Sequence, residues 1–174
     1  MNRRRFLEVA IVGNLMTWLS GCMRRQDPQA AASADFPPLN KTLEQWRELL
    51  ERERYNVLFR ESTERPGSSP LNAEKRPGVF VCAACYLPLF DAQDKYESGT
   101  GWPSFTQPIK ENHIGTKTDY KILVPRNEYH CARCGGHQGH VFTDGPPPRG
   151  QRWCNNGLAL LFIPAGTAPP ELRT

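Results

Sequence analysis

Two cysteine pairs with the same spacing, far apart in the chain, constrain the fold of this sequence more than any other feature. Cys82-Ala-Ala-Cys85 and Cys131-Ala-Arg-Cys134 each place two thiolates on a tight turn, from which both sulfurs can reach one tetrahedral metal ion. The two pairs complete a closed set of four sulfur ligands with no open coordination position, which predicts a structural zinc. The segment of about 45 residues between them is too long for a compact zinc ribbon, so it must itself be folded.

Two other interpretations of the cysteine pairs remain open from their spacing. They could be redox-active dithiols or two disulfides, and both chemistries occur in an oxidising compartment. Zinc is favoured because a thioredoxin-like motif is not expected twice in a β-rich sequence.

The folded part is expected to be mainly β, with antiparallel sheets and a short helical segment at its start. Thr42 and Gln45 match a capping box, after which Leu43, Trp46, Leu49 and Leu50 recur on one helical face. Short β-prone runs follow, broken by glycine and proline, and the clearest span 78–82, 119–124, 139–142 and 158–163. A chain of 174 residues has room for one such core.

The start of the chain indicates export. Residues 1–21 have a basic beginning and an apolar stretch that Glu8 interrupts, and they end in small residues before Cys22. This end resembles a bacterial lipobox, so Cys22 is expected to carry a lipid. Residues 22–40 then form a flexible tether, and 41–174 form the domain. The expected location is the bacterial cell envelope, on the periplasmic side, anchored to the membrane by the lipid.

The export route is less defined. Residues 2–7, Asn-Arg-Arg-Arg-Phe-Leu, resemble a twin-arginine signal, although Glu8 stands where a lysine is usual, and a general-secretion signal remains the alternative. The formal net charge is +4, and removal of residues 1–21, which hold three arginines and one glutamate, leaves +2. A charge this small excludes an electrostatic nucleic-acid site.

Cys154 is the one cysteine outside the pairs and the lipobox. It lies in a β-prone run after Arg152, whose guanidinium favours a thiolate, although a buried structural thiol is the alternative. His137 and His140 follow the second cysteine pair directly and could donate protons or bind a metal. Because four sulfurs already complete the zinc site, we expect the imidazoles to serve another purpose.

Together these residues resemble the B-type methionine sulfoxide reductase family, enzymes that reduce the R epimer of methionine sulfoxide. The match runs from about Thr42 to Ile163. Besides the two cysteine pairs, its motifs are ERP (64–66), SGTGWPSF (98–105), HQGHVFTDGP (137–146) and RWCNN (152–156).

The resemblance implies a zinc-containing β-tent fold and a role for each matching residue. Cys154 would be the nucleophile, with oxidised proteins or peptides as substrate, and Trp102 would receive the substrate methyl group. The polar groups around the sulfoxide would be His137, His140 and Asn156, and further substrate contacts would come from Arg152 and Phe142.

Two departures from the family pattern have consequences. Gly157 replaces the usual serine, and Thr100 replaces the resolving cysteine that many members carry. A Cys154 sulfenic acid would therefore need an external reductant, which we expect to be a thioredoxin-like protein. A non-catalytic zinc-stabilised binding module and a thiol oxidoreductase using the cysteine pairs remain as alternatives.

Overall fold

The computed structural model describes residues 36–174 of the chain. The predicted signal peptide, the predicted lipidation site Cys22 and most of the predicted tether lie outside the described residues. Among residues 36–174, no helix combines the length and apolar character needed to cross a membrane.

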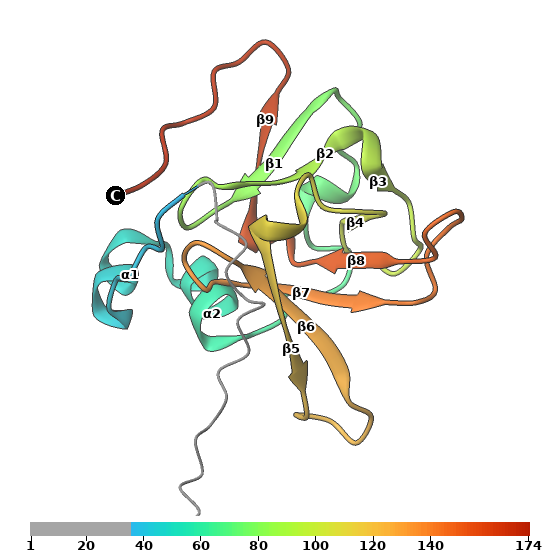
Figure 1. The fold of residues 1–174 in the computed structure, drawn as a ribbon, viewed down its shortest axis with the longest axis horizontal. Helices are drawn as coiled ribbons and strands as arrows, with labels where there is room; N and C mark the ends of the chain where they lie inside the picture. The colour runs from blue at the N-terminus through green and yellow to red at the C-terminus, as the bar shows by residue number, and fades with distance from the viewer. Residues whose placement is uncertain (1–35) are drawn as a thin grey trace, which may run out of the picture. The chain divides into compact units, whose positions relative to one another are not determined.

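The prediction of a mainly β fold with antiparallel sheets is confirmed (Figure 1). One sheet has three strands in the order β2-β1-β9, and the other has six in the order β3-β4-β8-β7-β6-β5. The strands are β1 Gly78–Cys82, β2 Pro88–Asp91, β3 Lys95–Tyr96, β4 Ser104–Phe105, β5 Ile114–Asp119, β6 Arg126–Cys131, β7 His137–Phe142, β8 Arg152–Asn155 and β9 Leu160–Pro164.

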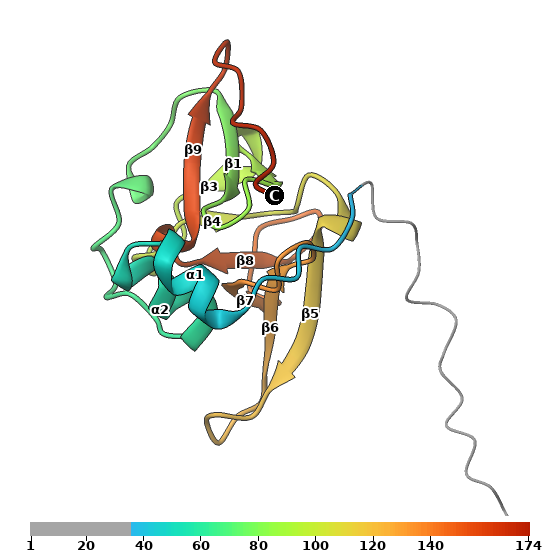
Figure 2. The same ribbon diagram turned by 90° about the vertical axis from the view of Figure 1, so that its left-hand side faces the viewer.

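Aromatic side chains from both sheets form the centre of the core. Phe90 of β2 stacks on Phe105 of β4 with ring centroids 4.3 Å apart, and Tyr129 of β6 meets Trp153 of β8 edge to face at 5.0 Å. All four are at most 5% exposed. In Figure 2 the strands β1 and β9 run across β7 and β8, and the contact between Phe90 and Phe105 joins the two sheets.

Two short helices replace the single expected one. Helix α1 spans Leu43–Leu49 and α2 spans Arg52–Arg60. The predicted capping box is present, because Gln45 N donates to Thr42 Oγ1 and Thr42 N donates to Gln45 Oε1. Of the predicted apolar face only Trp46 is buried, stacked on Phe59 of α2, whereas Leu43 and Leu49 are each 46% exposed.

Three of the four expected strands are found, and the fourth was placed wrongly. Residues 78–82 form β1, and the runs 139–142 and 158–163 fall largely in β7 and β9. The run 119–124 is not a strand: β5 ends at Asp119, and the apolar residues after it form the tip of the β5–β6 hairpin. The polar sequence of β5 itself, Ile-Gly-Thr-Lys-Thr-Asp, gave no β signal.

The packed part of the chain begins before the expected domain start at residue 41. Phe36 is 6% exposed and meets the ring of His113 edge to face at 5.3 Å. Leu39 N donates to the backbone oxygen of Arg133, which lies between the cysteines of the second pair. The end of the predicted tether is thus fixed to the domain, because two apolar side chains among its small polar residues find partners there.

Candidate active site and metal centre

Four cysteines meet where the two sheets approach each other. Cys82 ends β1 and Cys85 lies in the turn after it, while Cys131 ends β6 and Cys134 lies in the turn before β7. Their sulfurs all lie within 4.8 Å of one another, with 3.7 Å between Cys82 and Cys134 and 3.5 Å between Cys85 and Cys131. Tetrahedral zinc with Zn–S bonds of about 2.3 Å requires sulfur separations of about 3.8 Å. The cluster can therefore hold one metal ion.

The surroundings of the sulfurs favour a cation between them. None of the cysteines in residues 36–174 forms a disulfide, and three of the four are buried while Cys134 is half-buried. Burial raises the pKa of Cys82, because a lone thiolate there would lose its hydration. Gln138 Nε2 donates to Cys82 Sγ at 3.5 Å, as an outer partner of a metal ligand does.

A second site surrounds a cavity of about 100 Å³ beside the paired strands β7 and β8. Cys154 of β8 is directly opposite His140 of β7 in the strand register, so both side chains are on one face of the sheet. The residues lining the cavity are Thr63, Trp102, Arg126, Gly139, His140, Phe142, Cys154, Asn155 and Asn156.

Cys154 is a half-buried thiol surrounded by polar groups. Its neighbour on the other side in the sheet is Ser104 of β4, and the hydroxyls of Thr100 and Ser104 favour its thiolate form. Burial raises the pKa of the Cys154 thiol above its ordinary value of 9.0, and the Arg152 guanidinium and the two hydroxyls offset only part of this. The guanidinium favours the thiolate, but desolvation is larger. Thr100 lies beside the thiol, in the place that the family resemblance gives to a resolving cysteine.

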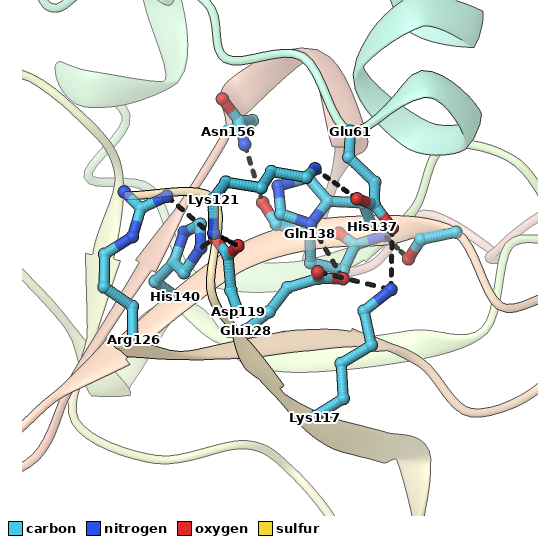
Figure 3. Close-up of polar contacts among 11 residues, drawn as sticks. Glu61, Lys117, Asp119, Lys121, Arg126, Glu128, His137, Gln138, His140 and Asn156 are labelled. Carbon is cyan, nitrogen blue, oxygen red and sulfur yellow. Dashed lines mark hydrogen bonds and ion pairs between the residues drawn. The ribbon is translucent and has the colours of Figure 1, made fainter. Parts of the chain in front are cut away.

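Each histidine of the predicted site has a carboxylate partner. His140 Nε2 lies 2.8 Å from Asp119 Oδ2, and His137 Nδ1 lies 3.0 Å from Glu128 Oε1 (Figure 3). Burial lowers the pKa of both imidazoles, which favours their neutral forms. His140 lines the cavity, whereas His137 does not, and the His137 side chain is only 3% exposed. The centroids of the two imidazole rings are 5.6 Å apart.

Arg152 acts on the cavity through its neighbours. Its guanidinium lies over the ring of Phe142 at 4.3 Å and donates to both oxygens of Asp144, each at 2.8 Å. Phe142 lines the cavity, but Arg152 does not. The arginine therefore orients the aromatic wall and lowers the pKa of the Cys154 thiol, and in this geometry it reaches the cavity only through Phe142.

Trp102 and Asn156 are both in the cavity wall and both are tied to the backbone near residue 64. Trp102 Nε1 donates to the Glu64 backbone oxygen at 3.2 Å, and Asn156 Oδ1 accepts from Glu64 N. Asn156 Nδ2 donates to Gln138 O, so both polar ends of this side chain are used. In this geometry Asn156 fixes the wall, and Trp102 contributes an aromatic side chain to the lining.

Several residues that build the site had no role assignable from the sequence, although Asp144 and Asn155 lie within the motifs at 137–146 and 152–156. Asp119, Glu128 and Asp144 hold the two histidines and Arg152, and Thr63, Arg126 and Asn155 line the cavity. The Glu64 carboxylate accepts from the backbone nitrogens of Gly157 and Leu158, which fixes the chain just after the active-site strand. The ERP motif contains Glu64, but its function depends on a contact about 90 residues away, which no local pattern reveals.

The raised thiol pKa predicts the pH dependence of alkylation at Cys154. Because a protonated thiol is unreactive, we expect the iodoacetamide reaction to accelerate with rising pH and to reach its midpoint above the ordinary 9.0. Arg152→Met removes the attracting charge and should move the midpoint higher. Peptide mass spectrometry would follow Cys154 alone, and a midpoint below that of a free cysteine would contradict the dominance of burial.

Gly157, the departure from the family pattern, has a structural explanation in Ser69. A Cβ at position 157 would lie 1.9 Å from Ser69 Oγ and 2.5 Å from its Cβ, so the Ser69 side chain fills the space. We expect Gly157→Ser to lower the free energy of unfolding by about 1–3 kcal/mol through overpacking. The double variant Gly157→Ser/Ser69→Gly should recover most of it, and equal urea midpoints for all three proteins would contradict this account.

Comparison with known proteins identifies the family of the chain. The SelR domain family matches residues 50–164. A protein of Pseudomonas putida named peptide methionine sulfoxide reductase MsrB is 47% identical over 126 residues, covering 72% of this chain and 95% of its own. A protein of the same name from Agrobacterium fabrum is 44% identical over 128 residues, covering 74% and 95%. The chain therefore belongs to the MsrB family of SelR-domain proteins.

Proposed function

We propose that this protein reduces methionine-R-sulfoxide in peptides and proteins to methionine, with Cys154 as the nucleophile. The observation that carries the proposal is the position of the Cys154 thiol, which opens into a small cavity opposite His140 and beside Trp102. The names of the relatives supply the substrate, and the choice of the R epimer follows from the family resemblance.

The residues around the cavity can carry out each part of the reaction. Trp102 and Phe142 offer apolar surface for the methyl group of the substrate. With the methyl group there, the sulfoxide oxygen faces the polar side of the cavity, where His140 lies. His140, neutral in the free protein, takes the thiol proton, and Asp119 stabilises the resulting imidazolium. The thiolate attacks the sulfoxide sulfur, and the proton from His140 meets the departing oxygen.

Atoms and electrons balance in this step. Attack forms a bond between the Cys154 sulfur and the substrate sulfur. The protonated oxygen then moves to the cysteine sulfur, and both the S–S bond and the original S–O bond break, so the substrate sulfur gains two electrons and the cysteine sulfur loses them. The products are methionine and a Cys154 sulfenic acid, which retains the original thiol proton as its hydroxyl. Because no net proton is consumed, a histidine that is neutral at rest is sufficient.

An external thiol then regenerates the enzyme. The other cysteines among residues 36–174 are clustered at the four-cysteine site, and Thr100 stands in the place that the family resemblance gives to a resolving thiol. Two external thiols reduce the sulfenic acid through a mixed disulfide and release water and a disulfide. We propose a thioredoxin-like protein as their source.

The four-cysteine cluster would hold a structural zinc ion. Cys82, Cys85, Cys131 and Cys134 supply the four thiolates that closed zinc sites use, and the sulfur separations fit. When bound, the ion supplies a cross-link between the two sheets and takes no part in the reaction. The chain itself would be an exported lipoprotein, anchored through Cys22 on the periplasmic side of the cell envelope, where its substrates would be oxidised exported proteins.

Turnover on separated epimers tests the proposed function. Purified protein with a chemical dithiol should reduce the R epimer of a methionine sulfoxide peptide and leave the S epimer unchanged. Without reductant, one equivalent of methionine should form, and Cys154 should gain one oxygen by mass spectrometry. No turnover of either epimer by a folded, zinc-loaded protein would instead favour the non-catalytic binding module.

A further inference from the structure

The tip of the β5–β6 hairpin exposes a concentrated group of apolar side chains. Tyr120 is 75% exposed, Ile122 49%, Leu123 fully and Val124 70%, and we call these four residues the hairpin-tip patch. They make up half of the eight large apolar side chains that are exposed among residues 36–174. Single exposed apolar residues are ordinary, but four within five positions mark a surface that binds something.

The hairpin carries this patch away from the core. Figures 1 and 2 both show β5 and β6 extending beyond the strands they pair with, with the connecting loop at the far end. No other part of the described chain could cover the tip, since all four side chains remain open to solvent. The apolar run 119–124 therefore has a β-prone composition without any core to pack on.

The base of the tip is part of the active site. Asp119, the residue before the patch, binds His140, and Arg126, two residues after it, lines the cavity with Cys154. Arg126 Nη2 also donates to Asp119 Oδ2 at 2.8 Å, which closes the base of the hairpin (Figure 3). Each leg of the tip is about three residues long, or about 10 Å. An extended peptide with its sulfoxide in the cavity covers that distance in about three residues.

Ion pairs fix the hairpin to the rest of the domain. Glu61, at the end of α2, binds Lys117 at 2.6 Å and also binds Lys121, and Lys117 lies 3.3 Å from the buried Glu128. The two lysines lower the pKa of Glu61 to about 2, so it stays charged at any ordinary pH. The patch is thus held in a defined position relative to the cavity.

The charges around the patch favour an apolar peptide over a membrane surface. The hairpin, residues 114–131, has three cationic side chains, Lys117, Lys121 and Arg126. Each is paired with a carboxylate of Glu61, Asp119 or Glu128. Anionic lipids attract unpaired lysines and arginines, and here the cationic charge is neutralised. An apolar peptide segment needs no such charge.

We propose that the hairpin-tip patch binds apolar side chains about three residues from the methionine sulfoxide in unfolded segments of protein substrates. This inference rests on the proposed function, and it specifies unfolded protein segments as the substrate class. Methionines in protein cores have apolar sequence neighbours, which become accessible when oxidation or stress unfolds the segment. A free amino acid fills the cavity without reaching the tip.

The test compares a tip variant with a matched surface variant, both in the full-length chain with Cys22→Ser. The tip variant is Ile122→Ser/Leu123→Ser, and the control is Leu43→Ser/Leu49→Ser, which removes two exposed leucines from α1. The substrates are N-acetyl-methionine-R-sulfoxide, a peptide with the sulfoxide between leucines and valines, and the same peptide with serines instead.

Wild type and control should prefer the apolar peptide over the serine peptide by roughly tenfold in kcat/KM. The tip variant should lose this preference through a higher KM, while its kcat/KM on the blocked amino acid stays unchanged. In the Cys154→Ser background, where no turnover occurs, fluorescence anisotropy should show the same loss of peptide binding.

An unchanged preference in the tip variant would overturn the proposal. A second outcome would also overturn it. If the wild type binds phosphatidylcholine–phosphatidylglycerol vesicles, and the tip variant loses this binding but keeps its peptide kinetics, then the patch contacts lipid. Failure of the wild type to reduce any of the three substrates would refute the proposed function instead, and the anisotropy measurement would still decide whether the patch binds peptide.

Discussion

Cys154→Ser is expected to lower the reduction of methionine-R-sulfoxide by at least about 10⁴-fold without unfolding the protein. A serine hydroxyl is close in size to the thiol, so it can occupy the same place opposite Ser104 in the sheet. It ionises far less readily than a thiol, however, and it cannot form the sulfenic acid that completes oxygen transfer. The variant should bind substrate and fail to turn it over.

Methionine formation from the separated R epimer, with a dithiol in excess, measures this loss. The matched control is Thr100→Ser, which keeps a hydroxyl beside the thiol and should retain activity within a few fold. Thermal unfolding and zinc content should be the same in all three proteins. Residual activity of Cys154→Ser within tenfold of the wild type would show that another group attacks the sulfoxide.

The cluster of four cysteines could be predicted from the sequence because each half of it is local. Two cysteines separated by two residues on a turn point to a common centre whatever the rest of the fold does, and the cluster of four sulfurs follows. The capping box at Thr42 was readable for the same reason. In both cases the interacting groups lie within four positions of each other along the chain.

The remainder of the candidate site depends on strand register, which the sequence does not reveal. Cys154 faces His140 because β8 pairs with β7 in one register, and Asp119 reaches His140 only because β5 and β6 form a hairpin beside β7. The hairpin was missed because β5 is polar, while the apolar run after it suggested a strand. The exposed apolar tip of a hairpin thus gave the same pattern as a core strand.

Loss of one cysteine of the four-cysteine cluster should destabilise the fold more than loss of Cys154. Cys131 is fully buried where β6 ends, and its sulfur lies 3.5 Å from that of Cys85, which follows the strand β1 of the other sheet. Binding of structural zinc contributes on the order of 10 kcal/mol to folding, whereas a domain of this size is stable by about 5–15 kcal/mol in total. We therefore expect Cys131→Ser to leave most of the chain unfolded at ambient temperature.

Zinc content by atomic emission and far-ultraviolet circular dichroism measure this effect, with Cys154→Ser as the matched substitution outside the cluster. The wild type should hold one zinc per chain, and prolonged treatment with a strong chelator should unfold it. Activity should be lost in parallel, since the turn that holds Cys134 leads directly into β7, the strand that positions His137 and His140. The opposite result would be a protein that contains no zinc, is destabilised by a dithiol and is unaffected by a chelator. That result would show that the cysteine pairs form disulfides, so that the cross-link between the sheets is covalent.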